Sequence, residues 1–224
     1  PYRCRREGEI IMTAEILERL GPTPVVPLIQ ADEVGVAVET ARALVKGGLT
    51  VLEVVLRTDR ALLCLQEIAT RIPGAITAAG TGLSGDHARA AANAGARFLV
   101  SPGLHEEVVA ASAACGLPLF PGVATATEVQ RAWNMGLRLL KFFPAGPAGG
   151  VPMISALASV FRDVRFMPTG GVSAANLADY LAVPAVIACG GSWLTPPAAV
   201  AGGDFDAITE LARAAVALAR RARG

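Results

Sequence analysis

The chain has 224 residues, 53% of them hydrophobic and 17% charged, and its formal net charge at pH 7 is +1. A chain of this length buries enough surface to fold as one compact domain. The near-neutral, mixed charge argues against binding to nucleic acid or to an anionic membrane, and the absence of any uninterrupted apolar stretch of about 18 residues argues against a membrane span.

The first eleven residues are basic and precede Met12. They lack the apolar segment of a secretory signal. We therefore interpret residues 1–11 as a leader or extension without stable structure, and residues 12–224 as a single domain whose native start is Met12. The first predicted element is an extra N-terminal helix over Thr13–Leu20, with Thr13 as its N-cap. We expect this helix to cover the floor of the domain.

Eight short apolar runs follow, and an amphipathic stretch typical of a helix separates each run from the next. Eight strands that alternate with helices predict a parallel sheet, and eight is the number that closes a barrel. We therefore expect an α/β fold, the (β/α)₈ TIM barrel, with an open doubly wound sheet as the alternative. The runs are Val25–Ile29, Val51–Leu56, Ala75–Ala79, Phe98–Ser101, Leu119–Gly122, Leu139–Phe143, Arg165–Thr169 and Val186–Cys189.

The sharpest candidate for chemistry is Lys141, which lies inside an apolar run and is one of only two lysines in the chain. Active sites of barrels lie at the C-terminal ends of the strands. Burial disfavours the charged form of an amine, and a neutral amine attacks a ketone to form an iminium, as arginine cannot. The alternative is a strand-end lysine whose ammonium group reaches solvent.

Two further charged residues belong to the second run. Glu53 lies among apolar residues, where a carboxylate needs a partner. It is a candidate general base, or the partner of a structural ion pair with Arg57 or Lys141. Arg57 lies four residues later at the strand mouth and suits a substrate carboxylate or phosphate, although a plain surface arginine fits the same position.

Paired glycines end the last two runs. Gly170-Gly171 follow Thr169, and Gly190-Gly191 precede Ser192. Loops after the seventh and eighth strands of a barrel commonly bind phosphate through backbone N–H groups, so we predict a phosphate site here. The two histidines, at positions 87 and 105, lie in separate predicted helices, so the sequence predicts no metal site and no cofactor.

The four cysteines, at positions 4, 64, 115 and 189, are far apart and show no metal-ligand spacing. Free thiols in a reducing compartment are the simplest interpretation of this pattern, and we expect a cytoplasmic location.

Seven segments together resemble the 2-keto-3-deoxy-6-phosphogluconate aldolase family, which includes 4-hydroxy-2-oxoglutarate aldolases. They run in order from about Pro22 to Pro196, nearly the whole chain apart from the leader and the final helix. One departure is Gly146-Pro147, which stands where the family often has Glu after its Phe-Pro-Ala segment. The matching segments are Glu53–Thr58, Ala79–Thr81, Val100–Leu104, Pro121–Thr125, Leu140–Ala145, Met167–Val172 and Gly190–Leu194.

The resemblance implies a class I aldolase, usually a homotrimer without a metal. Lys141 would form the Schiff base and Glu53 would act as general acid and base. The remaining implied roles are contacts with substrate: Arg57 and Thr81 for the carboxylate of the pyruvyl moiety, Pro102 and Phe143 for the pocket wall, Thr169 for a hydroxyl, and Gly170, Gly171 and Ser192 for the phosphate.

We therefore expect reversible cleavage of 2-keto-3-deoxy-6-phosphogluconate to pyruvate and glyceraldehyde 3-phosphate. Two alternatives keep the chemistry and change the substrate, to unphosphorylated 4-hydroxy-2-oxoglutarate or to the galactonate-derived epimer. A phosphosugar isomerase or epimerase on the same fold would need the phosphate loops without a nucleophilic Lys141. A catalytically silent ligand-binding barrel is the last alternative.

Overall fold

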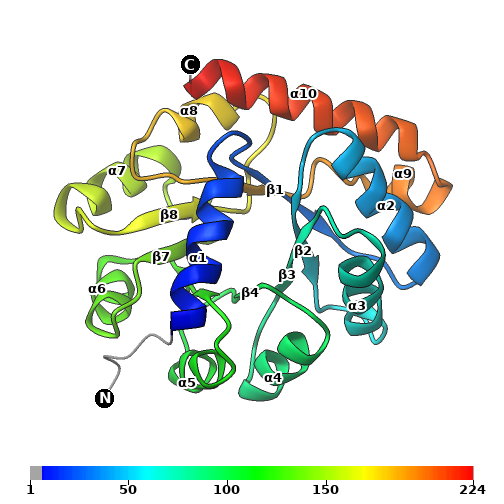
Figure 1. Cartoon of the computed structure of the whole chain (residues 1–224). Helices are drawn as coiled ribbons and strands as arrows, with labels where there is room; N and C mark the ends of the chain where they lie inside the picture. The colour runs from blue at the N-terminus through cyan, green and yellow to red at the C-terminus, as the bar shows by residue number, and fades with distance from the viewer. Residues whose placement is uncertain (1–6, 224) are drawn as a thin grey trace.

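The computed structural model describes residues 7–223, in which strands and helices alternate along the chain (Figure 1). The elements are α1 (Glu7–Leu20), β1 (Val25–Ile29), α2 (Val34–Lys46), β2 (Val51–Val55), α3 (Ala61–Arg71), β3 (Ile76–Gly80), α4 (Gly85–Asn93), β4 (Phe98–Val100), α5 (Glu106–Ala114), β5 (Leu119–Phe120), β6 (Gly122–Val123), α6 (Ala126–Asn134), β7 (Leu139–Phe142), α7 (Gly150–Val160), β8 (Arg165–Pro168), α8 (Leu177–Leu181), β9 (Cys189–Gly191), α9 (Pro197–Gly202) and α10 (Phe205–Arg223). Strands β1 to β8 fall on the first seven predicted apolar runs, because strands that are buried on both faces are mostly apolar. The last strand, β9, shares only Cys189 with the predicted run Val186–Cys189.

The strands form a closed parallel barrel with two seams. Six strands pair in the order β5-β4-β3-β2-β1-β9, and three pair in the order β6-β7-β8. Pro121 separates β5 from β6 within one predicted run, because proline has no N–H for the ladder, but its carbonyl accepts a hydrogen bond from Lys141 N at 2.9 Å. At the other seam, isolated parallel bridges join Phe166 to Val186 and Thr169 to Gly190. The predicted barrel is confirmed.

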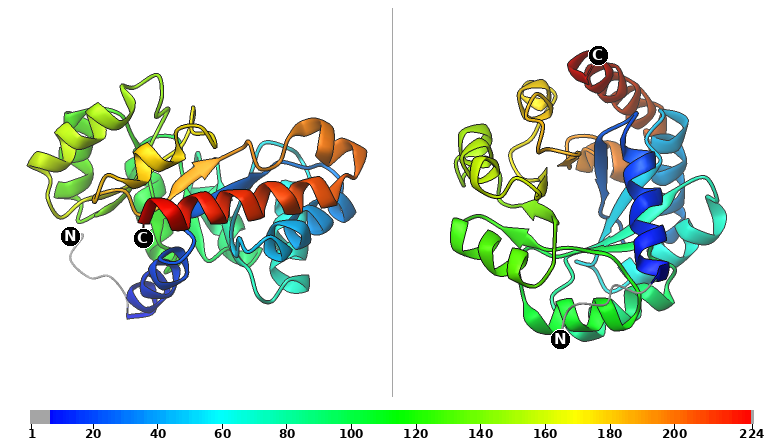
Figure 2. Two further views of the ribbon diagram at one scale, coloured as in Figure 1. Left: turned by 90° about the horizontal axis from the view of Figure 1, so that it is seen from above. Right: turned by 60° about the vertical axis from the view of Figure 1, so that its left-hand side comes forward.

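Helices surround the strands, and α1 lies across one end of them (Figures 1 and 2). Ile16 and Leu20 of α1 are buried in one apolar cluster with side chains from the strands, including Val26, Val51 and Phe98. This helix therefore closes the end of the barrel at which the strands begin, as predicted for the floor.

The start of α1 differs from the prediction. The helix begins at Glu7, so Thr13 lies within it and is not its N-cap, and residues 7–11, which were expected to lack stable structure, are helical. No proline interrupts the segment. The part of the leader prediction that falls on residues 1–6 lies outside the described residues.

Side chains alternate between the barrel lumen and the surrounding helices, as strand geometry requires. In β2, Val51 belongs to the cluster in the lumen, whereas Leu52 and Val54 pack against the helices. In β7, Leu140 and Phe142 pack against the helices. The same alternation directs the intervening residues, Glu53 of β2 and Lys141 of β7, into the lumen.

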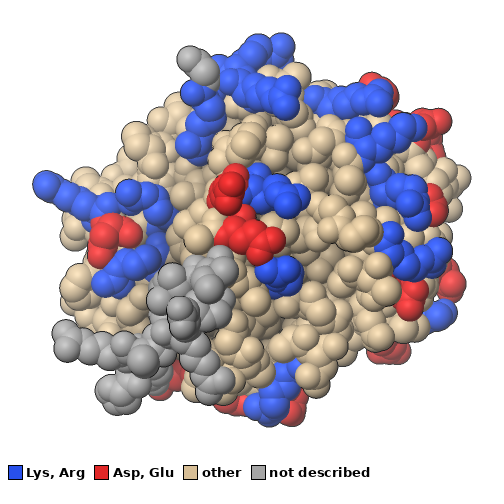
Figure 3. Space-filling view, viewed as in Figure 1, with Lys and Arg blue, Asp and Glu red and all other residues tan. Residues whose placement is uncertain are grey.

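The surface at the α1 end carries both signs of charge, interspersed with uncharged residues, and Lys and Arg gather along the edge formed by α10 (Figure 3). Among the helices of residues 7–223, none combines the length and the apolar character that crossing a bilayer requires.

Candidate active site

Two buried charges meet inside the barrel. Lys141 Nζ lies 3.4 Å from Glu53 Oε1, and the two side chains are 5% and 1% exposed. Glu53 Oε2 is also buried and has no hydrogen-bond partner among the described residues. A buried polar atom without a partner normally destabilises a fold, so this oxygen is a candidate to take part in chemistry. The pair supplies an amine nucleophile and, beside it, a carboxylate oxygen free to accept a proton.

Small residues make room for this pair. A Cβ atom built on Gly80, at the end of β3, would lie only 2.3 Å from Glu53 Oε1. A Cβ atom on Gly190 would lie 2.3 Å from Thr169 Oγ1, a second buried atom without a partner in the described part of the chain. Glycine at these two positions therefore determines where a carboxylate and a hydroxyl stand in the lumen.

Aromatic and proline residues form walls beside Lys141. Its Nζ lies 5.2 Å from the centroid of the Phe143 ring, and that ring also approaches the Gly170 loop, at 3.3 Å from a Cβ built there. On the other side, Gly122 pairs in register with Lys141. The Pro102 carbonyl lies so close to Gly122 that a Cβ there would be 2.0 Å from its oxygen.

Arg57 and Thr81 lie together at the mouth of the barrel. Arg57 Nε donates a hydrogen bond to Thr81 Oγ1 at 3.2 Å. Thr81 has φ of 62°, the left-handed region that a β-branched residue rarely adopts. Such strain costs about 1 kcal/mol or more and is typical of functional sites. Here it presents the Thr81 hydroxyl beside an exposed guanidinium that is free to bind an anion.

The loops after β8 and β9 carry the paired glycines. Gly170 and Gly171 have φ of 89° and 86°, a conformation open to glycine without strain. The loop after β7 lies against them, since Gly146 N donates to Gly170 O at 2.8 Å. A Cβ on Gly171 would come within 3.2 Å of Gly146 Cα. Gly146, at which the sequence departs from the family's usual Glu, therefore lies in direct contact with the glycine loop.

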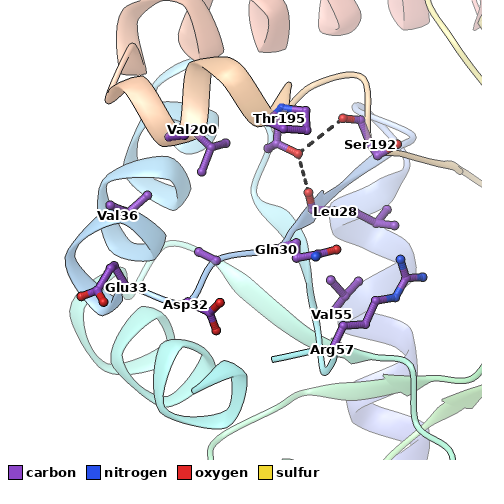
Figure 4. A pocket seen from close by; sticks show the side chains of 13 residues that line it. Leu28, Gln30, Asp32, Glu33, Val36, Val55, Arg57, Ser192, Thr195 and Val200 are labelled. Atoms are coloured by element: carbon purple, nitrogen blue, oxygen red, sulfur yellow. Dashed lines mark hydrogen bonds between the residues drawn. The ribbon is translucent and has the colours of Figure 1, made fainter. Parts of the chain in front are cut away.

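A cavity of about 510 Å³ opens at the mouth, next to β1, β2 and α9 (Figure 4). Arg57 and Ser192 line it, and Lys141 and Glu53 do not, because they lie deeper in the lumen. Thr195 Oγ1 donates to the Leu28 carbonyl at 2.6 Å and so ties the loop after β9 to strand β1. The cavity thus connects the residues expected at the two ends of a substrate.

The chain is similar to known proteins over most of its length. The model of the KDPG and KHG aldolase family matches residues 16–211. The chain belongs to this aldolase family. It is similar to the KHG/KDPG aldolase of Escherichia coli K12, with 47% identity over 193 residues that cover 86% of this chain and 91% of that protein.

Two solved structures resemble this member of the KDPG and KHG aldolase family. The KDPG aldolase of Legionella pneumophila, with pyruvate captured as a covalent carbinolamine intermediate, is 39% identical with a TM-score of 0.85, over 88% of this chain and 96% of that one. The 2-keto-3-deoxy-6-phosphogluconate aldolase of Zymomonas mobilis ZM4, with 3-phosphoglycerate, is 42% identical with a TM-score of 0.85, over 93% and 98%.

The sequence alone did not identify every residue at the mouth of this aldolase. Gln30, the residue after β1, lines the cavity, but it lies outside the predicted apolar run, which ends in Ile29. It is nevertheless the first polar residue after the run, and this position is the feature of the sequence that could have identified it. The contact between Gly80 and Glu53 depends on the register of two strands and has no signal in the sequence.

Burial raises the pKa of the Cys189 thiol, which points away from the lumen, to about 12. In residues 12–223, no group of three or more His, Cys, Asp and Glu side chains is placed to hold a metal ion.

Proposed function

We propose that the chain is a class I aldolase that cleaves 2-keto-3-deoxy-6-phosphogluconate to pyruvate and glyceraldehyde 3-phosphate. The observation that carries this proposal is the buried Lys141 amine, 3.4 Å from the Glu53 carboxylate, below a mouth that offers Arg57 and two glycine loops. Membership of the KDPG and KHG aldolase family supports it.

In the proposed mechanism the neutral amine of Lys141 attacks the C2 ketone and gives a carbinolamine, which loses water to form an iminium. Glu53 moves protons in these steps and then accepts the proton of the C4 hydroxyl. The C3–C4 bond breaks, its electron pair enters the iminium, and glyceraldehyde 3-phosphate leaves. The remaining enamine takes a proton at C3, and hydrolysis of the iminium releases pyruvate and the free amine.

The other residues are proposed to hold the substrate in position. Arg57 and Thr81 bind the carboxylate, since a guanidinium and a hydroxyl together match its two oxygens. Positioning of this kind lowers the barrier because the ketone reaches Lys141 already oriented. Thr169 is proposed to contact the C4 hydroxyl, and Pro102 and Phe143 to contact the pyruvyl carbons. The phosphate is proposed to bind to Gly170, Gly171, Gly190, Gly191 and Ser192.

The deciding experiment is borohydride reduction in the presence of pyruvate, followed by peptide mapping. The reduced pyruvyl adduct is expected on Lys141. The chain offers a matched control, because the only other lysine, Lys46, is exposed on α2 at 3.5 Å from Asp206. Lys141→Arg should abolish cleavage and the adduct, whereas Lys46→Arg should leave both intact. Absence of an adduct, or an adduct on Lys46, would overturn the mechanism.

The substrate alternatives keep the same chemistry. The Escherichia coli relative carries both substrates in its name, so turnover of 4-hydroxy-2-oxoglutarate should be compared with that of the phosphorylated acid and of its galactonate epimer. A phosphosugar isomerase would tolerate Lys141→Arg, and a silent binding barrel would turn over none of these compounds.

We also propose that the chain is a cytoplasmic homotrimer. Trp133 and Val160, which are 41% and 71% exposed, line one hollow of about 480 Å³ between α6 and α7, and exposed apolar surface of this kind marks protein contacts. Light scattering should give a mass of three times the 22.9 kDa of one chain. In the Val160→Asp variant the measured mass should fall toward that of a single chain. Cell fractionation tests the location.

A further inference from the structure

Gln30 is a polar side chain at the mouth to which the proposed mechanism assigns no role. It follows β1 directly, and the alternation along this strand, in which Val26 packs in the lumen and Leu28 lines the cavity, also turns Gln30 toward the mouth. Figure 4 shows its side chain lying between Ser192 and Arg57 in that view. All three residues line the same cavity.

The order of the strands explains this position. In the barrel, β1 lies between β2 and β9. Arg57 follows β2 and Ser192 follows β9, and in the proposed function they hold the carboxylate and the phosphate at opposite ends of the substrate. A molecule that reaches both must therefore cross the end of β1, where Gln30 stands.

One polar group of the substrate has no partner in the proposed site. The carboxylate, the C2 ketone, the C4 hydroxyl and the phosphate are each bound, but the C5 hydroxyl, next to the phosphate-bearing carbon, is not. The Gln30 amide has no hydrogen bond to any other described residue, and Figure 4 draws none to it. Because an amide both donates and accepts, it suits a hydroxyl better than an anion.

The charges around the cavity support the same assignment. Asp32 and Glu33 line it on the side away from Arg57 and Ser192 (Figure 4). Carboxylates repel a phosphate placed there, so the phosphate is directed to the glycine loops and an uncharged part of the substrate faces Gln30.

We infer that Gln30 binds the C5 hydroxyl of the substrate, which is the C2 hydroxyl of the aldehyde product. It thereby makes the chain select 2-hydroxy aldehydes over aldehydes that lack this group. Gln30 is thus a specificity-determining residue, and the inference rests on the proposed function.

The test is the condensation of pyruvate with two aldehydes, D-glyceraldehyde 3-phosphate and 3-oxopropyl phosphate, which differ only in the hydroxyl. Gln30→Met keeps the length of the side chain and removes its polar atoms. It should lower kcat/KM for the hydroxylated aldehyde about fivefold to tenfold, the effect of one neutral hydrogen bond, and leave the deoxy aldehyde unchanged. Gln66→Met, at an exposed position on α3 that does not line the cavity, should change neither value.

Equal losses with both aldehydes in Gln30→Met would show a structural effect and overturn the inference, as would no loss with either. The proposed function is tested apart from it by the pyruvate adduct on Lys141, which needs no aldehyde. Native protein that forms the adduct and condenses both aldehydes at equal rates is an aldolase without the proposed selectivity. Native protein that forms no adduct would remove both proposals.

Discussion

Adding one methyl group at Gly80 is expected to displace Glu53, the proposed general base, without touching Lys141, the proposed nucleophile. Gly80 ends β3, and its backbone carbonyl accepts a hydrogen bond from Leu56 N at 2.9 Å. Its φ is not in the left-handed region, so alanine meets no backbone strain. The new Cβ would, however, lie 2.3 Å from Glu53 Oε1, the oxygen nearest to Lys141.

The size of the effect follows from that distance. Non-bonded carbon and oxygen atoms rest at about 3.5 Å, so the carboxylate of Glu53 must retreat by roughly 1 Å. A misplacement of about 1 Å in an active site lowers the rate about 100-fold, which corresponds to about 2.7 kcal/mol in the barrier. Glu53 is fully buried. Gly80→Ala should therefore cleave the phosphorylated 2-keto acid about 100 times more slowly than the native protein.

The assay is pyruvate release under saturating substrate, with thermal unfolding measured alongside it. Gly74→Ala is the matched control, because a Cβ at this exposed turn before β3 meets no atom within 4 Å; its rate should equal that of the native protein. If Gly80→Ala retained a rate within about threefold of native, the contact with Glu53 would not control catalysis and the reasoning from this distance would be wrong.

Three further outcomes follow from the structure. Gly190→Ala should press on the Thr169 hydroxyl, 2.3 Å from the new Cβ, and slow cleavage about tenfold while formation of the pyruvate adduct is unchanged; equal loss in both steps would contradict this. Because burial raises the pKa of Cys189 to about 12, iodoacetamide at about pH 8 should label the exposed Cys115 of the folded protein and spare Cys189, as read by mass spectrometry; equal labelling of the two would refute it. Burial, which raises the pKa of Glu128, is outweighed by hydrogen bonds from backbone and side-chain donors, so the pKa lies below its usual value. Urea unfolding should show Glu128→Ala less stable than native by about 0.5 kcal/mol at neutral pH, because this exposed carboxylate completes the capping box of α6. The difference should close as the pH falls through the folded pKa.

The barrel was predictable because the runs are apolar on both faces almost throughout and because a helix separates each run from the next. What the sequence could not reveal is where the ladder breaks. Pro121 divides the predicted fifth run into two strands, β5 and β6, although the residues on both sides of it are buried. The eighth run is Val186–Cys189 in the prediction, whereas β9 spans Cys189–Gly191. The barrel closes here in two places, because Val186 forms only an isolated bridge to Phe166 and the residues from Cys189 onward pair with β1.

Strand ends were a productive guide to the site, since they place Arg57, Thr81 and Ser192 at one mouth. They failed where a contact depends on which strands become neighbours. Gly80 and Glu53 are adjacent because β2 and β3 pair with Glu53 opposite Ala78. That register is a property of the folded sheet, and no composition or spacing in either segment reports it.

The sequence left two interpretations of Glu53 open, a structural ion pair and a general base, and the structure shows that they are compatible. The alternation of side chains along two strands brings the charges together. In β2 and in β7 every second side chain points into the lumen, and Glu53 and Lys141 are both among these side chains. A shift of either strand by one residue would turn its charge into the layer of helices. Burial of an ammonium and a carboxylate is tolerable only as a close pair, and a close pair in which one carboxylate oxygen stays free is also the arrangement that Schiff-base chemistry requires. The proposed reaction must therefore open the contact that pairs these two buried charges, when Lys141 turns to the ketone.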